Sequence, residues 1–130
     1  MQKSKGITEG GNKIMKKKEI VIPILNSEYT VIVCWGTSKQ VEKVLRSWGH
    51  KRDDVSKQLD SRRGVCFYAT DCHPIIALPK RPKTPEEIGT LAHEATHAVG
   101  NIWEKLGESV YDEVFAHSIA AVVRSTLKNK

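Results

Sequence analysis

The spacing of apolar residues changes several times along the chain, and each change marks an expected element. From Glu19 to Leu25, and again from Tyr29 to Trp35, isoleucine, valine and aromatic residues dominate, and Asn26 and Ser27 lie between the two runs. Two β-branched runs separated by turn residues are typical of a β-hairpin. Shorter runs at 64–69 and 74–78 predict two further strands joined by a short turn.

Other stretches carry apolar residues at helical spacing. The first covers 41–48 and stops at Gly49. Periodicity of about 3.6 residues indicates an amphipathic helix that packs one face on a core. The polar residues that follow, 50–63, are expected to form a loop or a short helix.

The helix with the clearest start begins at residue 85. Thr84 can cap it, Pro85 suits the first helical position, and Glu87 completes a capping box. Gly107 is a suitable stop, and a final helix is expected from about Ser109 to near the C-terminus. The predicted order is therefore β-β-α-β-β-α-α.

Length and composition agree with one globular unit. The 130 residues suffice for a single domain, and 39% hydrophobic with 28% charged residues is ordinary for such a domain. Residues 1–14 are polar and lack periodicity, so we expect a disordered N-terminal extension followed by a single domain over 15–130. The extension is either a segment upstream of a natural start at Met15 or a genuine flexible tail. The predicted fold class is α+β, with a small, mainly antiparallel sheet packed on helices.

Charge and cysteine content narrow the function classes. No apolar run approaches the roughly 20 residues that cross a bilayer, and no secretory signal is visible, so we expect a cytoplasmic protein. Three cysteines are an odd number, which favours reduced thiols over a disulfide framework. The net charge of +6 has no aromatic-interleaved basic motif beside it, so no nucleic-acid partner is indicated. The oligomeric state is left open.

The sequence His93-Glu94-Ala95-Thr96-His97 carries the clearest chemistry. Two histidines four residues apart on a helix share one face, so both imidazoles can reach one metal ion. Glu94 lies on the flank of that face, where its carboxylate can contact a metal-held water. This H-E-x-x-H pattern is the signature of zinc hydrolases, above all of metalloproteases.

A catalytic zinc typically takes a third protein ligand and leaves its fourth position to water. Glu113, 16 residues after His97 and across the Gly107 turn, is the preferred candidate, and His117 is the alternative. A return helix would bring both back over the motif. The metzincin pattern would place a third histidine at position 103, where this chain has Trp103.

His93, Glu94 and His97, followed by a glutamate on the next helix, resemble the gluzincin arrangement of zinc peptidases. From 74 to about 125 the chain is similar to small zincin-like proteins of bacteriophages and prophages. The resemblance implies a zincin-like pair of metal-binding helices and a Zn²⁺ ion held by His93, His97 and Glu113. It also implies that the strand before the zinc helix, Ile75 to Leu78, borders the cleft and pairs with substrate.

The expected activity is zinc-dependent hydrolysis of a peptide bond in a peptide or protein substrate. Glu94 would take the proton from the zinc-held water and pass it to the leaving amine. His117 and Tyr111 are the candidate donors to the oxyanion, and Tyr68 is a weaker one. The alternatives are hydrolysis of another amide, or a binding protein of a phage or mobile element in which the zinc is structural.

Overall fold

The computed structural model describes residues 18–25, 28–69, 72–107 and 113–128. They form four strands and four helices: β1 (Glu19–Ile24), β2 (Tyr29–Trp35), α1 (Ser38–Ser47), α2 (Val55–Asp60), β3 (Val65–Phe67), β4 (Ile75–Leu78), α3 (Pro85–Leu106) and α4 (Glu113–Lys128). The order expected from the sequence is confirmed, with α2 as the short helix of the polar stretch. Residues 1–14, expected to be disordered, lie outside the described part.

The four strands form one mixed sheet in the order β1-β2-β4-β3. β1 and β2 make the predicted antiparallel hairpin, and β3 and β4 are also antiparallel. The central pair, β2 and β4, is parallel, so the chain crosses over the sheet between them through α1 and α2. The structure therefore has the expected α+β class, with two antiparallel pairings and one parallel pairing.

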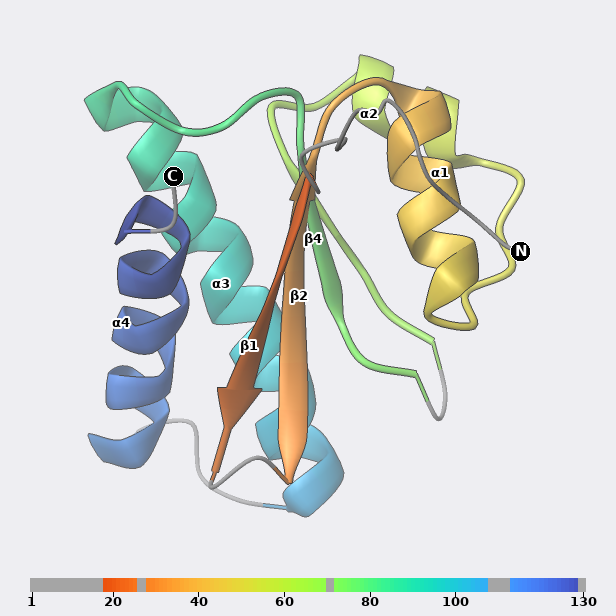
Figure 1. Cartoon of the computed structure of the whole chain (residues 1–130). Helices are drawn as coiled ribbons and strands as arrows, with labels where there is room; N and C mark the ends of the chain where they lie inside the picture. The colour runs from red at the N-terminus through yellow and green to blue at the C-terminus, as the bar shows by residue number, and fades with distance from the viewer. Residues whose placement is uncertain (1–17, 26–27, 70–71, 108–112, 129–130) are drawn as a thin grey trace, which may run out of the picture.

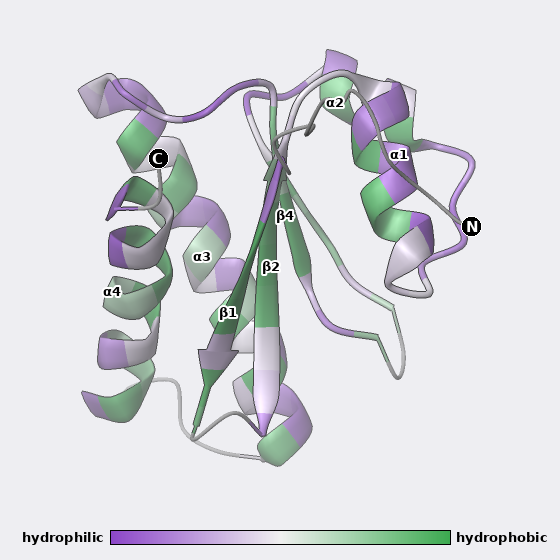
Figure 2. Cartoon of the chain, in the orientation of Figure 1, coloured by the Kyte–Doolittle hydropathy of each residue, from purple (hydrophilic) through white to green (hydrophobic). Residues whose placement is uncertain are grey.

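Helices cover both faces of this sheet, α3 and α4 on one side and α1 and α2 on the other (Figure 1). Successive side chains of β2 point to opposite faces of the sheet and pack on both helix layers. Val31 and Val33 pack against α3 and α4, whereas Ile32 and Cys34 pack against α1 and α2. Figure 2 shows the resulting pattern, with hydrophobic residues concentrated on the strands and on the helix faces turned toward them.

Strand β4 lies inside the sheet and not at its edge. Its four residues are all buried, as expected for a strand that has helices on both faces and neighbours on both sides. The prediction that Ile75 to Leu78 forms the free strand bordering a cleft is therefore wrong. β3 occupies that edge, next to α3.

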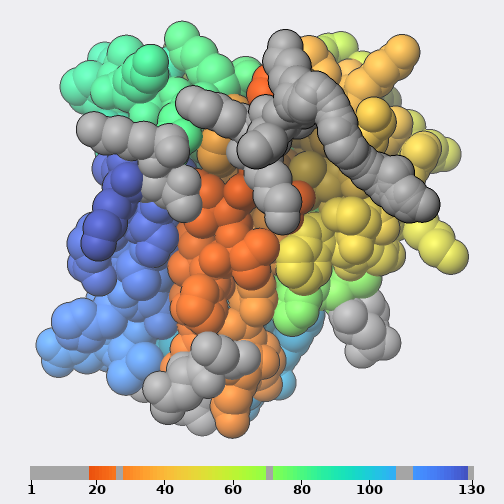
Figure 3. All heavy atoms as spheres, in the orientation of Figure 1, coloured from red at the N-terminus to blue at the C-terminus, as the bar shows by residue number. Residues whose placement is uncertain are grey.

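The opposite edge of the sheet belongs to β1. This strand contacts α4, and Figure 3 shows it at the surface beside that helix. Ile20, Ile22 and Ile24 point into the core shared with α3 and α4, whereas Val21 is 48% exposed. The last helix thus helps to bury the first strand.

Helix α3 is 22 residues long and begins with the predicted capping box. Thr84 Oγ1 accepts from Glu87 N at 3.2 Å, and Glu87 Oε1 accepts from Thr84 N at 3.0 Å. The helix ends at Gly107, which has a φ of 72°. That left-handed conformation suits glycine because it has no Cβ. Both ends of α3 are therefore set by local sequence.

We expect Thr84→Ala to destabilise the domain by about 1 kcal/mol, because the amide of Glu87 loses its acceptor at the helix start. For a domain of this size the melting temperature should fall by about 4 °C. Urea unfolding followed by circular dichroism measures the loss of free energy of unfolding, and a thermal melt measures the fall in melting temperature. Thr96→Ala is the control, since Thr96 is exposed in the interior of the same helix. Equal losses in the two variants would contradict a capping role.

Candidate metal centre

Helix α3 carries the H-E-x-x-H motif with its two kinds of residue on different sides. His93 and His97 are exposed, whereas Glu94 is 9% exposed and faces the sheet. His93 Nε2 and His97 Nε2 lie 3.2 Å apart, with the two rings nearly perpendicular at 78°. The helix therefore brings both imidazole nitrogens to one point above its surface.

The spacing of the two nitrogens fits zinc. Two ligands at 2.0–2.1 Å from a tetrahedral ion are about 3.3 Å apart. The same spacing allows one neutral imidazole to donate a hydrogen bond to the other. The distance between the two nitrogens is therefore compatible with two ligands of one metal ion.

Glu94 has the surroundings expected of a general base. Burial raises the pKa of its carboxyl group, while His93, His97 and Arg62 partly offset the rise. Glu94 and His93 line one hollow of about 500 Å³, which also contains Arg62 and Gly64. The carboxylate thus lies beside the two histidines and opens onto a space that a substrate can enter.

Edge strand β3 supplies the wall opposite the motif. Val65 and Phe67 pack toward α1 and α2, so the alternate residues Cys66 and Tyr68 turn toward α3. Gly64 continues this side, and a Cβ there would lie 2.8 Å from Thr90 Cγ2 and 3.4 Å from Glu94 Cγ. Only glycine allows the strand to approach the motif helix this closely.

Tyr68 is the aromatic hydroxyl that lies nearest the motif among the sequence candidates within the described residues. It lines a second hollow of about 670 Å³, whose other residues are Thr96, His97, Gly100, Asn101, Glu104 and Phe115. Burial raises the pKa of Tyr68, and Cys66, Glu94 and Glu104 raise it further. The phenol stays protonated at neutral pH and can donate a hydrogen bond.

Glu113 and His117 do not join this group. Their side chains are 85% and 77% exposed, and Glu113 Oε2 lies 3.9 Å from His117 Nε2. The cause is helical phase. Phe115 turns toward α3 and packs edge-on against Trp103, and residues two positions away on a helix point about 200° apart. Tyr111, the other predicted donor, lies outside the described residues.

Within the described ranges, no group of three or more histidine, cysteine, aspartate or glutamate side chains could hold a metal ion. The carboxylate that shares the hollow with His97 is that of Glu104, seven residues later on α3. Sequence reasoning missed Glu104, although a spacing of seven places it on the His97 face. Asn101, between them, has a buried Oδ1 that finds no hydrogen-bond partner among the described residues.

Comparison with known protein families, with curated proteins and with solved structures finds no match to this chain. The resemblance to zincins thus rests on the motif residues themselves. None of the helices among the described residues is long and apolar enough to cross a membrane. Cys34, Cys66 and Cys72 all carry free thiols.

Proposed function

We propose that this protein is a zinc-dependent hydrolase, a minimal metallopeptidase in which His93 and His97 hold the metal. The observation that carries the proposal is the convergence of the two Nε2 atoms at 3.2 Å beside the buried carboxylate of Glu94. A solvated surface pair of histidines has no need of a buried glutamate between them, because burying a carboxylate costs free energy.

The third ligand in the proposal is Glu113, with His117 and Glu104 as the alternatives. Glu113 has the spacing of the gluzincin arrangement, and its exposed side chain would have to turn toward α3 to reach the ion. Glu104 already lines the hollow that holds His97. A carboxylate oxygen from either residue suits zinc beside two imidazoles.

Each side chain has a separate role in the proposed reaction. A bound zinc would supply a water with a pKa of about 7 and would polarise the substrate carbonyl. Glu94 accepts the proton of that water and later donates it to the leaving amine. In this proposal Tyr68 donates a hydrogen bond to the oxygen that becomes negative, because it lines the hollow with His97 whereas His117 is exposed. His117 and Tyr111 are the other candidates for that role.

The substrate would bind along β3. Among the described residues this strand pairs only with β4, so its outer edge could pair with an extended peptide. The hollow with His93 and Glu94 and the hollow with His97 and Tyr68 both adjoin this strand. A peptide held there would have the motif beside its backbone.

The proposal is tested by incubating the zinc-loaded protein with a mixture of unstructured peptides and identifying new termini by mass spectrometry. We expect cleavage that stops when a chelator removes the metal and resumes when zinc is added back. Cleavage that survives complete metal removal would refute a zinc hydrolase. Bound zinc without cleavage of peptides or other amides would favour the alternative, a binding protein with a structural metal.

A further inference from the structure

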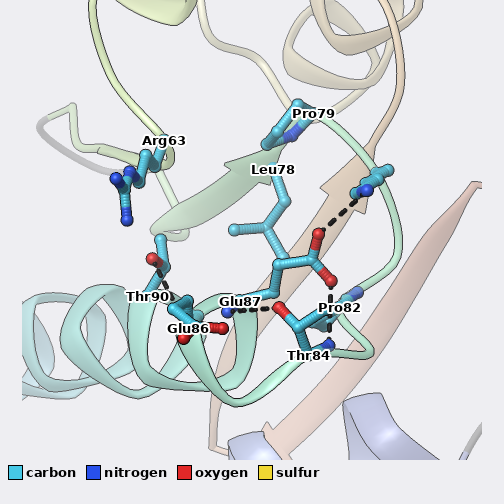
Figure 4. A pocket seen from close by; sticks show the side chains of 9 residues that line it. Arg63, Leu78, Pro79, Pro82, Thr84, Glu86, Glu87 and Thr90 are labelled. Atoms are coloured by element: carbon cyan, nitrogen blue, oxygen red, sulfur yellow. Dashed lines mark hydrogen bonds and ion pairs between the residues drawn. The ribbon is translucent and has the colours of Figure 1, made fainter.

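A pocket of about 280 Å³ lies beside the first turns of α3 (Figure 4). Its floor and one wall are apolar, formed by Leu78 at the end of β4 and by Pro79 and Pro82 in the segment that leads to the helix. Thr90 of α3 lines the side toward the motif. The space is large enough for one bulky side chain, and its lining suits an apolar one.

The pocket continues into the hollow of the candidate metal centre. Arg63, Glu86 and Thr90 line both spaces, and the second space reaches His93 and Glu94. Thr90 precedes Glu94 by four residues, which is about 6 Å along a helix. One residue of an extended chain spans about 3.3 Å, so a peptide beside Glu94 reaches the pocket within two residues.

The charges around the pocket largely cancel. Lys80 Nζ lies 3.0 Å from Glu87 Oε2, and Glu87 Oε1 accepts from the amides of Lys83 and Thr84. Hydrogen bonds from Thr84, Lys83 and Lys80 hold the pKa of Glu87 down to about 2. Arg63 and Glu86 then remain at the rim with opposite charges, so the apolar floor decides what binds.

We propose that this pocket selects a large apolar side chain, such as leucine or phenylalanine, one or two residues from the bond that is cleaved. This proposal rests on the proposed function, because the selected side chain belongs to a substrate only if the protein cleaves peptides. Side-chain selection by the pocket can nevertheless be measured without turnover. Gly64 matters to the geometry, because its missing Cβ lets β3 lie against Thr90 between the pocket and Glu94.

The test compares Thr90→Met with Ser56→Met, using the full zinc-loaded chain and a peptide library. Ser56 is an exposed hydroxyl residue of α2, on the other face of the sheet from α3, and it lines neither the pocket nor the two hollows beside the motif. Methionine at position 90 should extend into the pocket. We expect it to lower the preference for leucine or phenylalanine over alanine at one fixed position by about 10- to 100-fold. Ser56→Met should leave the preference at that position unchanged.

A second measurement is independent of cleavage. In amide NMR spectra, N-acetyl-leucinamide should shift the signals of Gly64, Leu78 and Thr90, and N-acetyl-glutamic acid amide should not. The shifts should disappear in Thr90→Met. Such binding in a protein that cleaves nothing would support the pocket and refute the peptidase.

Three cleavage results would overturn the pocket. The first is cleavage without any preference near the scissile bond, and the second is a preference that Thr90→Met leaves intact. Either would leave the hydrolase standing. The third is selection of an acidic residue that Arg63→Ala abolishes, since the charged rim and not the apolar floor would then determine which side chain binds. Absence of both cleavage and ligand-induced shifts would refute both proposals.

Discussion

Replacing Glu94 by glutamine is expected to lower hydrolysis by two or more orders of magnitude while zinc content and fold stay intact. The amide keeps the size and shape of the carboxylate but cannot accept the proton of the attacking water, and general acid–base catalysis contributes about 10²- to 10⁴-fold. Because Glu94 is buried against Gly64 and β3, the isosteric change avoids a cavity. Initial rates on the best peptide found, with elemental analysis alongside, measure the effect.

Glu86→Gln is the matched control for this change. Glu86 lines the same hollow, but it is exposed and precedes Glu94 by eight residues, which is about 12 Å along a helix. It should change the rate by much less than Glu94→Gln. Wild-type hydrolysis in Glu94→Gln would remove it as the base, and loss of the metal would make it a structural residue.

The second large effect concerns the metal. We expect about one zinc per chain in the wild-type protein and nearly none in His97→Ala, because His93 and the third ligand alone give two protein ligands where a catalytic zinc needs three. His97 is exposed, so the variant should keep its circular dichroism spectrum and melting temperature. His73→Ala is a control that removes a histidine from a different part of the structure. Zinc content near zero in the wild-type protein after zinc-supplemented purification would refute the site.

The third ligand is decided by the same measurement. Glu113→Ala, His117→Ala and Glu104→Ala are compared for zinc affinity with the wild-type chain. Loss in Glu113→Ala would confirm the ligand set expected from the gluzincin spacing. Loss of zinc affinity in Glu104→Ala alone would mean that all three ligands, His93, His97 and Glu104, come from α3. Unchanged affinity in all three variants would exclude each of these ligands.

Local signals in the sequence were sufficient for most of the elements. The Thr84 capping box and Gly107 set the ends of α3, and both are confirmed by hydrogen bonds and backbone angles. The hairpin of β1 and β2 was predicted by two β-branched runs around a turn. These features depend on neighbours within a few residues, and for that reason a single sequence is enough to find them.

Strand order and helical phase could not be obtained in the same way. Ile75 to Leu78 is four apolar residues, which suits either a buried central strand or a cleft edge, and only the parallel pairing with β2 decides between them. The direction of Glu113 depends on which face of α4 packs on α3. Trp103 and Phe115 determine that face, and their contact joins two helices.

The position of Tyr68 depends both on a local pattern in the sequence and on long-range packing. Tyr68 ranked behind His117 and Tyr111 as a donor because it is distant from the motif in sequence. Period-two alternation along β3 turns it toward α3, but this matters only once β3 is known to lie against that helix. Long-range packing therefore favours Tyr68 over the exposed His117, whereas Tyr111 lies outside the described residues.

The contact between β1 and α4 has a consequence for how the chain folds. About 90 residues separate these two elements, so their docking closes a long loop of chain. Because loop closure costs conformational entropy, we expect α4 to dock on β1 late in folding. Until α4 docks, Ile20, Ile22 and Ile24 keep part of their apolar surface in water, on a strand whose outer edge can pair with another chain. Aggregation during refolding should therefore begin at β1, and it should depend more on the attachment of α4 than on the motif helix.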